Sequence, residues 1–402
     1  MSNLVVIAGG AAMGSSVAAH LLADPDFGGR VLVVEKDPSY RLAGSALSAA
    51  SIRQQYSQAV NVRLSLHGLA FLRDPGRFLP VGEDPPALGL REGGYLYLAG
   101  TETGAGALRR NNALQRQEGA EIALLDAAAL AARFPWLETG DLLLGSHGVT
   151  GEGWFDGWAL LQLLRGAARR LGATFVADEV VGFRREGGRI SGAVLKERGE
   201  VPCRALVDCA GSGGAALARL AGIDIPVRAK RRSVFSFSSR NPLPRCPLLI
   251  DTTGVWMRPD GEPRPEGRSF IAGWSPPAAA DPDWSDDDPA SREVDWELFE
   301  EVVWPALASR IPALAEIRPG RAWAGPYDMN LADHNAVIGP APGLENFHLC
   351  NGFSGHGLQH APGIGRGLAE LIVHGRFRTL DLSALGFLRI IENRPLVEDN
   401  VI

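Results

Sequence analysis

The sequence predicts a protein of mixed α/β and α+β class, in which a doubly wound parallel sheet is joined to a module of antiparallel sheet. Over residues 4–35, an apolar run, a glycine-rich turn, a stretch with helical spacing and a second apolar run follow one another. Between about 225 and 325 the pattern changes to alternating apolar and polar residues with Pro-rich connections. A chain of 402 residues is long enough for two such modules.

The parallel sheet is predicted from short apolar runs that do not alternate. Leu4 to Ile7, Arg30 to Glu35, Thr174 to Val176 and Ala205 to Val207 are runs of this kind, which is typical of parallel strands covered on both faces. Helical spacing predicts helices over Ser15–Leu22 and Trp158–Gly172. We also expect an antiparallel pair, Val180–Phe183 with Ser191–Lys196, around a turn at Glu186–Gly188.

The second module and the C-terminal part carry further signals. Alternation over Val234–Phe237 predicts a strand, and Trp296, Phe299, Val303 and Leu307 predict one face of a helix over Arg292–Ile311. The acidic stretch Asp281–Asp288 is interpreted as a solvated loop. Near the C-terminus we expect a strand, a glycine-rich turn and a helix, at Asn346–Cys350, Gly352–Gly357 and Gly363–His374.

Composition and charge exclude several classes of function. A net charge of -6 disfavours nucleic acid and anionic membrane surfaces as partners and leaves small molecules as the expected ligands. We expect no transmembrane segment, since no run of about 18 apolar residues occurs. The four cysteines lack CxxC spacing, which suits a reducing compartment, and we expect a cytoplasmic protein. His356 and His360 have metal-pair spacing without an acidic partner, so no metal is expected.

The first glycine-rich turn predicts a nucleotide site. Gly9 and Gly14 stand where a strand must turn directly into a helix and present bare backbone N–H groups to a pyrophosphate. Ala11, preceded by Gly10, replaces the usual middle glycine. Glu35 ends the second strand, where a carboxylate accepts ribose hydroxyls and disfavours an NADP-type phosphate.

A second glycine-rich turn, Asn351 to Gln359, favours FAD over NAD. It leads into the C-terminal helix, so backbone N–H groups again point at an anionic group. The N1–C2=O edge of a flavin gains negative charge on reduction and suits such a position. A simple NAD dehydrogenase has no need of a second turn so far along the chain.

These residues resemble the D-amino-acid oxidase superfamily of FAD-dependent oxidoreductases, which includes sarcosine oxidase and dimethylglycine dehydrogenase. The resemblance spans the chain and rests on 5–16, 33–36, Ala210-Gly211, Asp333–Gly339 and Gly352–Gly357. Within this superfamily, Trp304-Pro305, Ala322–Gly325, Gly363–Arg366 and Asp399–Ile402 are similar to the FAD-dependent oxidoreductase domain-containing group linked to mitochondrial complex I assembly.

The resemblance implies a Rossmann-like FAD-binding domain of glutathione-reductase type and an antiparallel substrate domain. We expect the first to comprise 1–80, 146–224 and 325–402, and the second 81–145 and 225–324. The cofactor-binding residues expected are Gly9, Gly10, Ala11, Ala12, Met13, Gly14, Glu35, Lys36, Ser45, Ser51, Val180, Ala210, Gly211, Gly352, Ser354, Gly355, His356, Gly357, Leu358 and Gln359.

The resemblance further implies flavin-dependent oxidation of an N-substituted or secondary amino acid to an imine. Arg53 is at the position of a carboxylate-binding arginine, with Tyr56 close behind and His356 near the flavin. Alternatively, Arg53 is a charged residue at the surface or neutralises the charge of a pyrophosphate. A 2-hydroxy acid dehydrogenase using His356 as base, or an assembly protein that keeps FAD as a structural ligand, are alternative functions.

Three departures from the superfamily pattern refine this expectation. Ser48 replaces the flavin-linked histidine of dimethylglycine dehydrogenase relatives, and no cysteine follows Gly325-Pro326, so we expect non-covalent FAD. Ile271 and Gln359 replace lysines, the first of which activates oxygen in sarcosine oxidases. A dehydrogenase that passes electrons to a quinone or an electron-transfer flavoprotein is therefore favoured over an oxidase that uses O₂.

Overall fold

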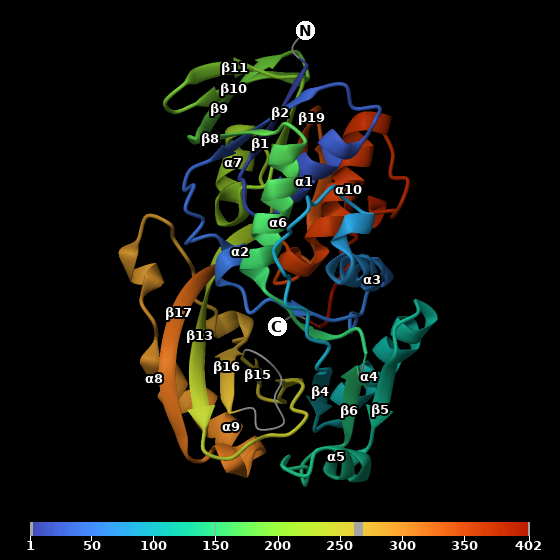
Figure 1. The fold of residues 1–402 in the computed structure, drawn as a ribbon, viewed down its shortest axis with the longest axis vertical. Coiled ribbons are helices and arrows are strands. Elements are labelled where there is room, and N and C mark those ends of the chain that lie inside the picture. The colour runs from blue at the N-terminus through green and yellow to red at the C-terminus, as the bar shows by residue number, and fades with distance from the viewer. Residues whose placement is uncertain (1–2, 149, 261–267, 401–402) are drawn as a thin grey trace.

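The computed structural model describes residues 3–148, 150–260 and 268–400 of the chain. Two large sheets organise it, one in the upper half and one in the lower half of Figure 1. The upper sheet has the order β18-β19-β12-β1-β2-β8, and its pairs are parallel except for β18 with β19. Its strands are β1 (Leu4–Ala8), β2 (Arg30–Glu35), β8 (Thr174–Ala177), β12 (Ala205–Asp208), β18 (Val337–Ala341) and β19 (Leu344–Asn351).

Both faces of the upper sheet are covered, as the apolar runs predict. Val5 and Ile7 of β1 pack in one core, while Val6 and Ala8 pack in another on the opposite face. The helices α1 (Ala12–Ala23), α6 (Gly157–Arg170) and α10 (Gly357–His374) cover the first face (Figure 1), and α3 (Ala59–Arg73) packs against α10. The second face packs against α7 (Gly214–Leu220) and a three-stranded sheet of β9 (Val180–Glu186), β10 (Arg189–Leu195) and β11 (Gly199–Pro202).

The lower sheet has eight strands in the order β17-β13-β16-β15-β14-β4-β6-β5. It is antiparallel apart from the parallel pair β4–β14, which joins the strands from 95–148 to those from 227–330. The strands are β4 (Tyr95–Ala99), β5 (Ile122–Leu125), β6 (Leu144–Gly148), β13 (Val227–Ser239), β14 (Leu248–Ile250), β15 (Val255–Pro259), β16 (Ser269–Trp274) and β17 (Ile317–Asn330). Its helices are α4 (Glu102–Gln117), α5 (Ala127–Arg133), α8 (Trp296–Leu298) and α9 (Trp304–Arg310).

Short elements lie between the two large sheets. They are α2 (Gly44–Leu47) and the two-stranded sheet of β3 (Ser51–Ile52) with β7 (Gly153–Trp154). After α10, the chain forms α11 (Leu388–Ile391), and residues 397–400 then return to the start of α3 through bonds to Ser57 and Gln58. The fold class predicted from the sequence is confirmed.

Two predicted helix boundaries are wrong. The helix expected over 292–311 begins at Trp296, where Asp295 caps it, and a π-helical turn, Phe299–Val303, precedes α9. Pro305 has no N–H for a regular helical bond, which fits a widened turn at this point. The helix expected over Gly363–His374 begins six residues earlier, at Gly357, and contains Pro362.

The acidic stretch is a loop with several exposed residues, as predicted, but it is also attached to the rest of the molecule. Three of its aspartates form ion pairs with Lys36, Lys230 and Arg232, and Trp284 is buried. Opposite charges distant in sequence therefore hold this segment against the molecule.

Candidate functional site

One cavity of about 1010 Å³ lies between the two large sheets. Gly9, Glu35 and Ala210 line it from the carboxyl ends of β1, β2 and β12, while Tyr95 and Trp256 line it from the lower sheet. The carboxyl edge of a parallel sheet is where such folds place their ligands. The glycine-rich turns at the two ends of the chain therefore meet at one site.

The first turn leaves no room for side chains at two of its glycines. A Cβ on Gly9, whose φ is +92°, would overlap the carbonyl of Cys209, and a Cβ on Gly14 would overlap the carbonyl of Gly9. Ala11 is the N-cap of α1 and lines the cavity, so its methyl group is accommodated. The N-terminal turn of α1 thus faces the cavity with backbone N–H groups that lack partners within the helix.

Glu35 is fixed beside this turn. Its carboxylate accepts hydrogen bonds from the backbone N–H groups of Gly10 and Asp37, both at 2.8 Å. Burial raises the pKa of Glu35 in spite of these bonds. A carboxylate held in this way is oriented to accept further hydrogen bonds from a ligand in the cavity.

The second turn is anchored by a residue that sequence reasoning missed. Asp328, near the end of β17, accepts hydrogen bonds from Gly352 N (3.0 Å) and Phe353 N (3.1 Å). Burial raises the pKa of Asp328 to about 6. His356 is the N-cap of α10, so the first turn of that helix faces the cavity at Gly357 to Gln359.

Arg53 lines the cavity and is only 2% exposed. Its Nη1 donates to Gln55 O and its Nη2 to Asn400 O, both at 2.6 Å, and its guanidinium carbon lies 4.0 Å from the ring centre of Tyr56. These two bonds leave other N–H donors of the guanidinium for a ligand. The surface role considered for Arg53 is excluded by its burial.

Gln359 connects the second turn to Arg53. Its Oε1 accepts a hydrogen bond from Arg53 N at 3.0 Å, and its Nε2 donates to the Tyr56 hydroxyl at 2.5 Å. Tyr56 is fully buried behind this layer and does not line the cavity. The ring of Tyr56 lies 4.9 Å from that of His356, edge to face.

Glu152 is a second residue that sequence reasoning missed. It is fully buried, and its carboxylate accepts hydrogen bonds from Gln54 N (2.5 Å) and Gln55 Nε2 (2.8 Å), the residues directly after Arg53. Burial raises the pKa of Glu152 to about 7. In the sequence, its only signal is its place between two glycines, Gly151 and Gly153. In the structure both glycines have positive φ.

Most of the predicted site residues border the cavity. Those that line it are Gly9, Ala11, Ala12, Met13, Glu35, Lys36, Ser45, Ser51, Arg53, Val180, Ala210, Gly211, Gly355, His356, Gly357, Leu358 and Gln359. Those that lie behind its wall are Gly10, Gly14, Tyr56, Gly352 and Ser354. Two members of the second group bond to the first, since Gly10 N donates to Glu35 and the Tyr56 hydroxyl accepts from Gln359.

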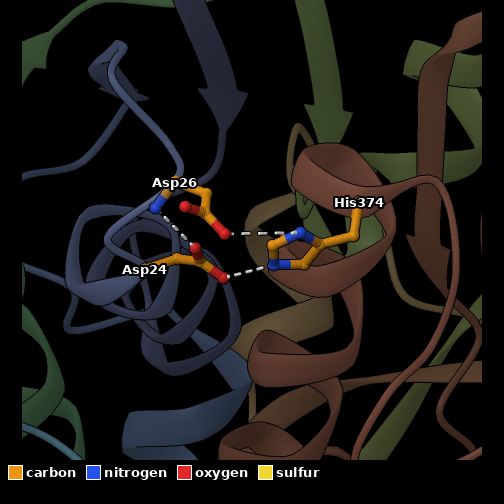
Figure 2. Close-up of side chains that lie close together, drawn as sticks. All are labelled: Asp24, Asp26 and His374. Atoms are coloured by element: carbon orange, nitrogen blue, oxygen red, sulfur yellow. Dashed lines mark hydrogen bonds and ion pairs between the residues drawn. The ribbon is translucent and has the colours of Figure 1, made fainter.

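A histidine with two acidic neighbours lies away from the cavity (Figure 2). His374 Nε2 is 2.8 Å from Asp24 Oδ2, and His374 Nδ1 is 4.0 Å from Asp26 Oδ2. Arg378 Nη1 lies 3.1 Å from the same Nε2, and its positive charge opposes a cation at that nitrogen. We interpret this cluster as a contact between the last turn of α10 and the end of α1.

Comparison with known proteins identifies the family. The family model described as "DAO: FAD dependent oxidoreductase" matches residues 5–371. The chain belongs to this family. It is an FAD-dependent oxidoreductase, so the resemblance and the cofactor predicted from the sequence are confirmed.

The relatives of this DAO-family chain include both curated proteins and solved structures. FAD-dependent oxidoreductase domain-containing protein 1 of Xenopus laevis is 38% identical, over 99% of this chain and 84% of the relative. Mitochondrial sarcosine dehydrogenase of Mus musculus is 26% identical, over 93% of this chain and 40% of the relative. L-proline dehydrogenase from P. horikoshii has a TM-score of 0.81 at 23% identity, covering 98% of this chain and 99% of that one.

The residues around the cavity fit FAD. Two helix N-termini face the cavity at opposite ends of the chain, which suits a ligand with a pyrophosphate and a distant ring that accepts negative charge. Ser45 Oγ and His356 Nε2 border the cavity and, within the described residues, have no hydrogen-bond partner although they are shielded from solvent. Buried polar atoms of this kind indicate sites at which a ligand completes the bonding.

Proposed function

We propose that this DAO-family protein oxidises the C–N bond of an N-substituted or secondary amino acid to an imine. The observation that carries the proposal is Arg53, a buried cation on the wall of the cavity whose backbone N–H donates to Gln359 at the end of the second turn. Among the relatives, sarcosine, dimethylglycine and L-proline dehydrogenases are named for substrates that combine a carboxylate with a substituted nitrogen.

Bound FAD supplies the acceptor for a hydride from the substrate carbon. Arg53 would bind the substrate carboxylate through the guanidinium donors that Gln55 and Asn400 leave free. These two carbonyls fix the guanidinium plane, so the substrate is held in one orientation. Burial lowers the pKa of His356 well below its ordinary value, so this neighbour is neutral and does not repel an amine entering in protonated form.

We propose cofactor roles for the residues that border the cavity at its two ends. Glu35 would accept the adenosine ribose hydroxyls, and the N-terminal turn of α1 together with Ser45 would bind the pyrophosphate. The backbone of Val180 would meet the adenine. The N-terminal turn of α10 would face the flavin ring. The division into an FAD domain and a substrate domain, with the boundaries given above, belongs to the same proposal.

We propose that FAD is bound non-covalently and that a quinone or flavoprotein, in preference to O₂, accepts its electrons. Ser48, at the cavity, offers no imidazole for a flavin linkage. Ile271 is buried among apolar residues and provides no cation for superoxide. Flavin that stays with acid-precipitated protein, or reduced enzyme that reoxidises in air at turnover speed, would contradict this proposal.

The hydroxy-acid alternative is weaker than amine oxidation. It requires His356 as a general base, yet burial lowers the pKa of His356 far below neutrality and makes the imidazole a poor base. The assembly role requires no chemistry at the cavity and predicts that no substrate reduces the flavin.

We also propose a cytoplasmic location. The four cysteines are buried and free, as expected in a reducing compartment. No helix within residues 3–148, 150–260 and 268–400 is long and apolar enough to span a membrane.

The decisive experiment is anaerobic reduction of the purified protein. N-methyl amino acids, secondary amino acids, primary amino acids and 2-hydroxy acids are added separately while the flavin absorbance near 450 nm is followed. Bleaching by an N-substituted or secondary amino acid supports the proposal. Bleaching by hydroxy acids alone, or by none of the compounds, contradicts it.

A further inference from the structure

The segment 281–292, here called the acidic strap, runs along the edge of the cavity. Its residues Trp284, Ser285, Asp286, Asp287 and Arg292 line the cavity together with Glu35 and Gly211. The strap follows β16 of the lower sheet, whereas Glu35 and Gly211 follow strands of the upper sheet. A part of the lower half therefore borders the end of the cavity at which the first glycine-rich turn lies.

The strap is fixed at its base by β13. Trp284 N donates to Ala229 O and Arg231 N donates to Pro282 O, both at 2.8 Å. Two ion pairs add to these backbone bonds: Lys230 pairs with Asp283 at 2.7 Å, and Arg232 pairs with Asp281 at 2.5 Å. The base of the strap is thus joined to the sheet through backbone bonds and two ion pairs.

Asp286 joins the strap to the opposite half of the molecule. Its Oδ2 lies 2.5 Å from Lys36 Nζ, and its Oδ1 accepts from Ser212 Oγ at 3.3 Å. Trp284 Nε1 donates to Oδ1 at 2.6 Å, and Arg292 Nη2 donates to Asp286 O at 2.8 Å. The carboxylate is therefore held in place by its own segment and reaches across to two others.

The two residues that Asp286 contacts lie on either side of the first glycine-rich turn. Lys36 follows β2 and Ser212 follows β12, and these strands are the two neighbours of β1 in the sheet. A carboxylate that bonds to both sides connects these two segments across the first turn, and it lines the cavity together with Ala11 and Glu35. A ligand whose adenosine and pyrophosphate lie at Ala11 and Glu35 would share the cavity with this contact.

We propose that the acidic strap is a wall of the FAD site and that Asp286, bonded to Lys36 and Ser212, is a latch that retains the adenosine–pyrophosphate arm. The inference rests on the proposed location of the adenosine beside Glu35. The latch is largely electrostatic and partly exposed, with 32% of the Asp286 side chain and 53% of the Lys36 side chain accessible, so salt weakens it.

The test is the rate at which the holoenzyme releases FAD after dilution, followed by flavin fluorescence. Asp286→Asn keeps the shape of the side chain and removes its charge, and Lys36→Met removes the partner. Each variant is expected to release FAD about fivefold faster than wild type at low salt. The double variant is expected to be no faster than either single one, because both substitutions break the same contact.

A matched control and a salt series separate the latch from general loosening. Glu118→Gln breaks an ion pair with Arg63 of 2.6 Å on residues that do not line the cavity, and it should leave FAD release unchanged. In about 1 M NaCl, wild type should approach the release rate of Asp286→Asn. Additive effects of Lys36→Met and Asp286→Asn, or equal acceleration by Glu118→Gln, would overturn the latch.

A further variant distinguishes failure of the latch from failure of the proposed FAD orientation. Glu35→Gln should weaken FAD binding if the adenosine ribose lies there, whatever the strap does. Weaker binding by Glu35→Gln with unchanged release from Asp286→Asn would refute the latch alone. Unchanged FAD binding by Glu35→Gln would refute the orientation, and the inference with it.

Discussion

At the scale of single residues, the proposed function rests on Arg53 as the group that binds the substrate carboxylate. Arg53→Lys keeps a positive charge but loses the planar fork, and kcat/KM for a carboxylate substrate should fall about 10- to 100-fold, as expected for one charged hydrogen bond. Arg53→Met should lower kcat/KM further, because it also removes the charge. Steady-state kinetics at matched flavin content check this prediction.

The corresponding amine without a carboxylate separates binding from structural damage at Arg53. If Arg53 binds the carboxylate, the preference of wild type for the acid over the amine should disappear in Arg53→Met, while turnover of the amine stays close to that of wild type. Equal losses for both compounds would indicate that the substitution only disturbs Gln55 and Asn400.

Glu152 gives stability a dependence on pH. Its pKa is raised by burial from the ordinary 4.5 to about 7, so between these values the folded protein holds a proton that the unfolded chain releases. The contribution of Glu152 to stability therefore falls as pH rises through this window, by about 3 kcal/mol in total. Above pH 7 the loss of stability caused by ionised, buried Glu152 is complete.

Glu152→Gln is expected to remove this dependence, because an amide stays neutral. Relative to wild type, the free energy of unfolding of the variant should rise by about 3 kcal/mol between pH 5 and pH 8 in urea titrations. Glu345→Gln, at a side chain that is 86% exposed, is the control and should show no such trend. A constant difference at all pH values for Glu152→Gln would contradict the assignment.

The roles of these residues differ in how far a sequence can reveal them. The positions of Gly9, Gly14 and Glu35 were predictable because a phosphate-binding turn needs local backbone freedom and a carboxylate one strand further on. The roles of Glu152 and Asp328 were not predictable, since each carboxylate accepts hydrogen bonds from backbone groups that come near it only after folding. Glu152 meets Gln54, 98 residues away, and nothing in its own neighbourhood requires an acid.

At the scale of elements, residues 397–400 support the wall that carries Arg53. Glu398 is fully buried and accepts hydrogen bonds from Ser57 N, Ser57 Oγ and Asn61 Nδ2. Glu398→Ala removes the acceptor of Ser57 N and Ser57 Oγ and one of the two acceptors of Asn61 Nδ2, and it should lower the free energy of unfolding by about 2 kcal/mol. It should also raise KM, because Asn400 O no longer fixes Arg53.

Thermal melting and KM together check the prediction for Glu398. Glu392→Gln serves as the control, because Glu392 pairs with Arg394 on an exposed surface and should change neither quantity. A variant Glu398→Ala that melts like wild type, with an unchanged KM, would refute the support role of this segment.

Elements with regular apolar spacing were predicted well, and elements governed by charge were not. The parallel strands were recognisable because both of their faces are buried. The attachment of the acidic strap could not be predicted because its cationic partners, Lys36, Lys230 and Arg232, lie about 50 to 250 residues earlier in the chain. The start of α10 was placed too late because Pro362 was taken as a boundary, while packing against α1 and α3 sustains the helix through it.

At the scale of the whole molecule, segments of both halves line one cavity, and the proposed FAD site would join them there. Removal of FAD should therefore lower the melting temperature of the entire protein, not of one half. Restoring FAD to about 100 times its Kd should recover about 2.7 kcal/mol of stability. Differential scanning calorimetry of the FAD-depleted and reconstituted protein checks this, and a melting temperature independent of FAD concentration would contradict it.

The order of strands in the upper sheet also constrains how the protein is made. β1 lies between β2 and β12, and β12 then pairs with β19, whose residues are synthesised more than 300 positions after β1. Ser16 of α1 bonds to Ala361 O of α10, a contact spanning 345 residues. A ribosome-bound chain therefore holds an incomplete sheet with an exposed apolar edge until nearly all of it has emerged. We therefore expect the cofactor to be acquired late in biogenesis, and chains that stop before β18 are expected to aggregate.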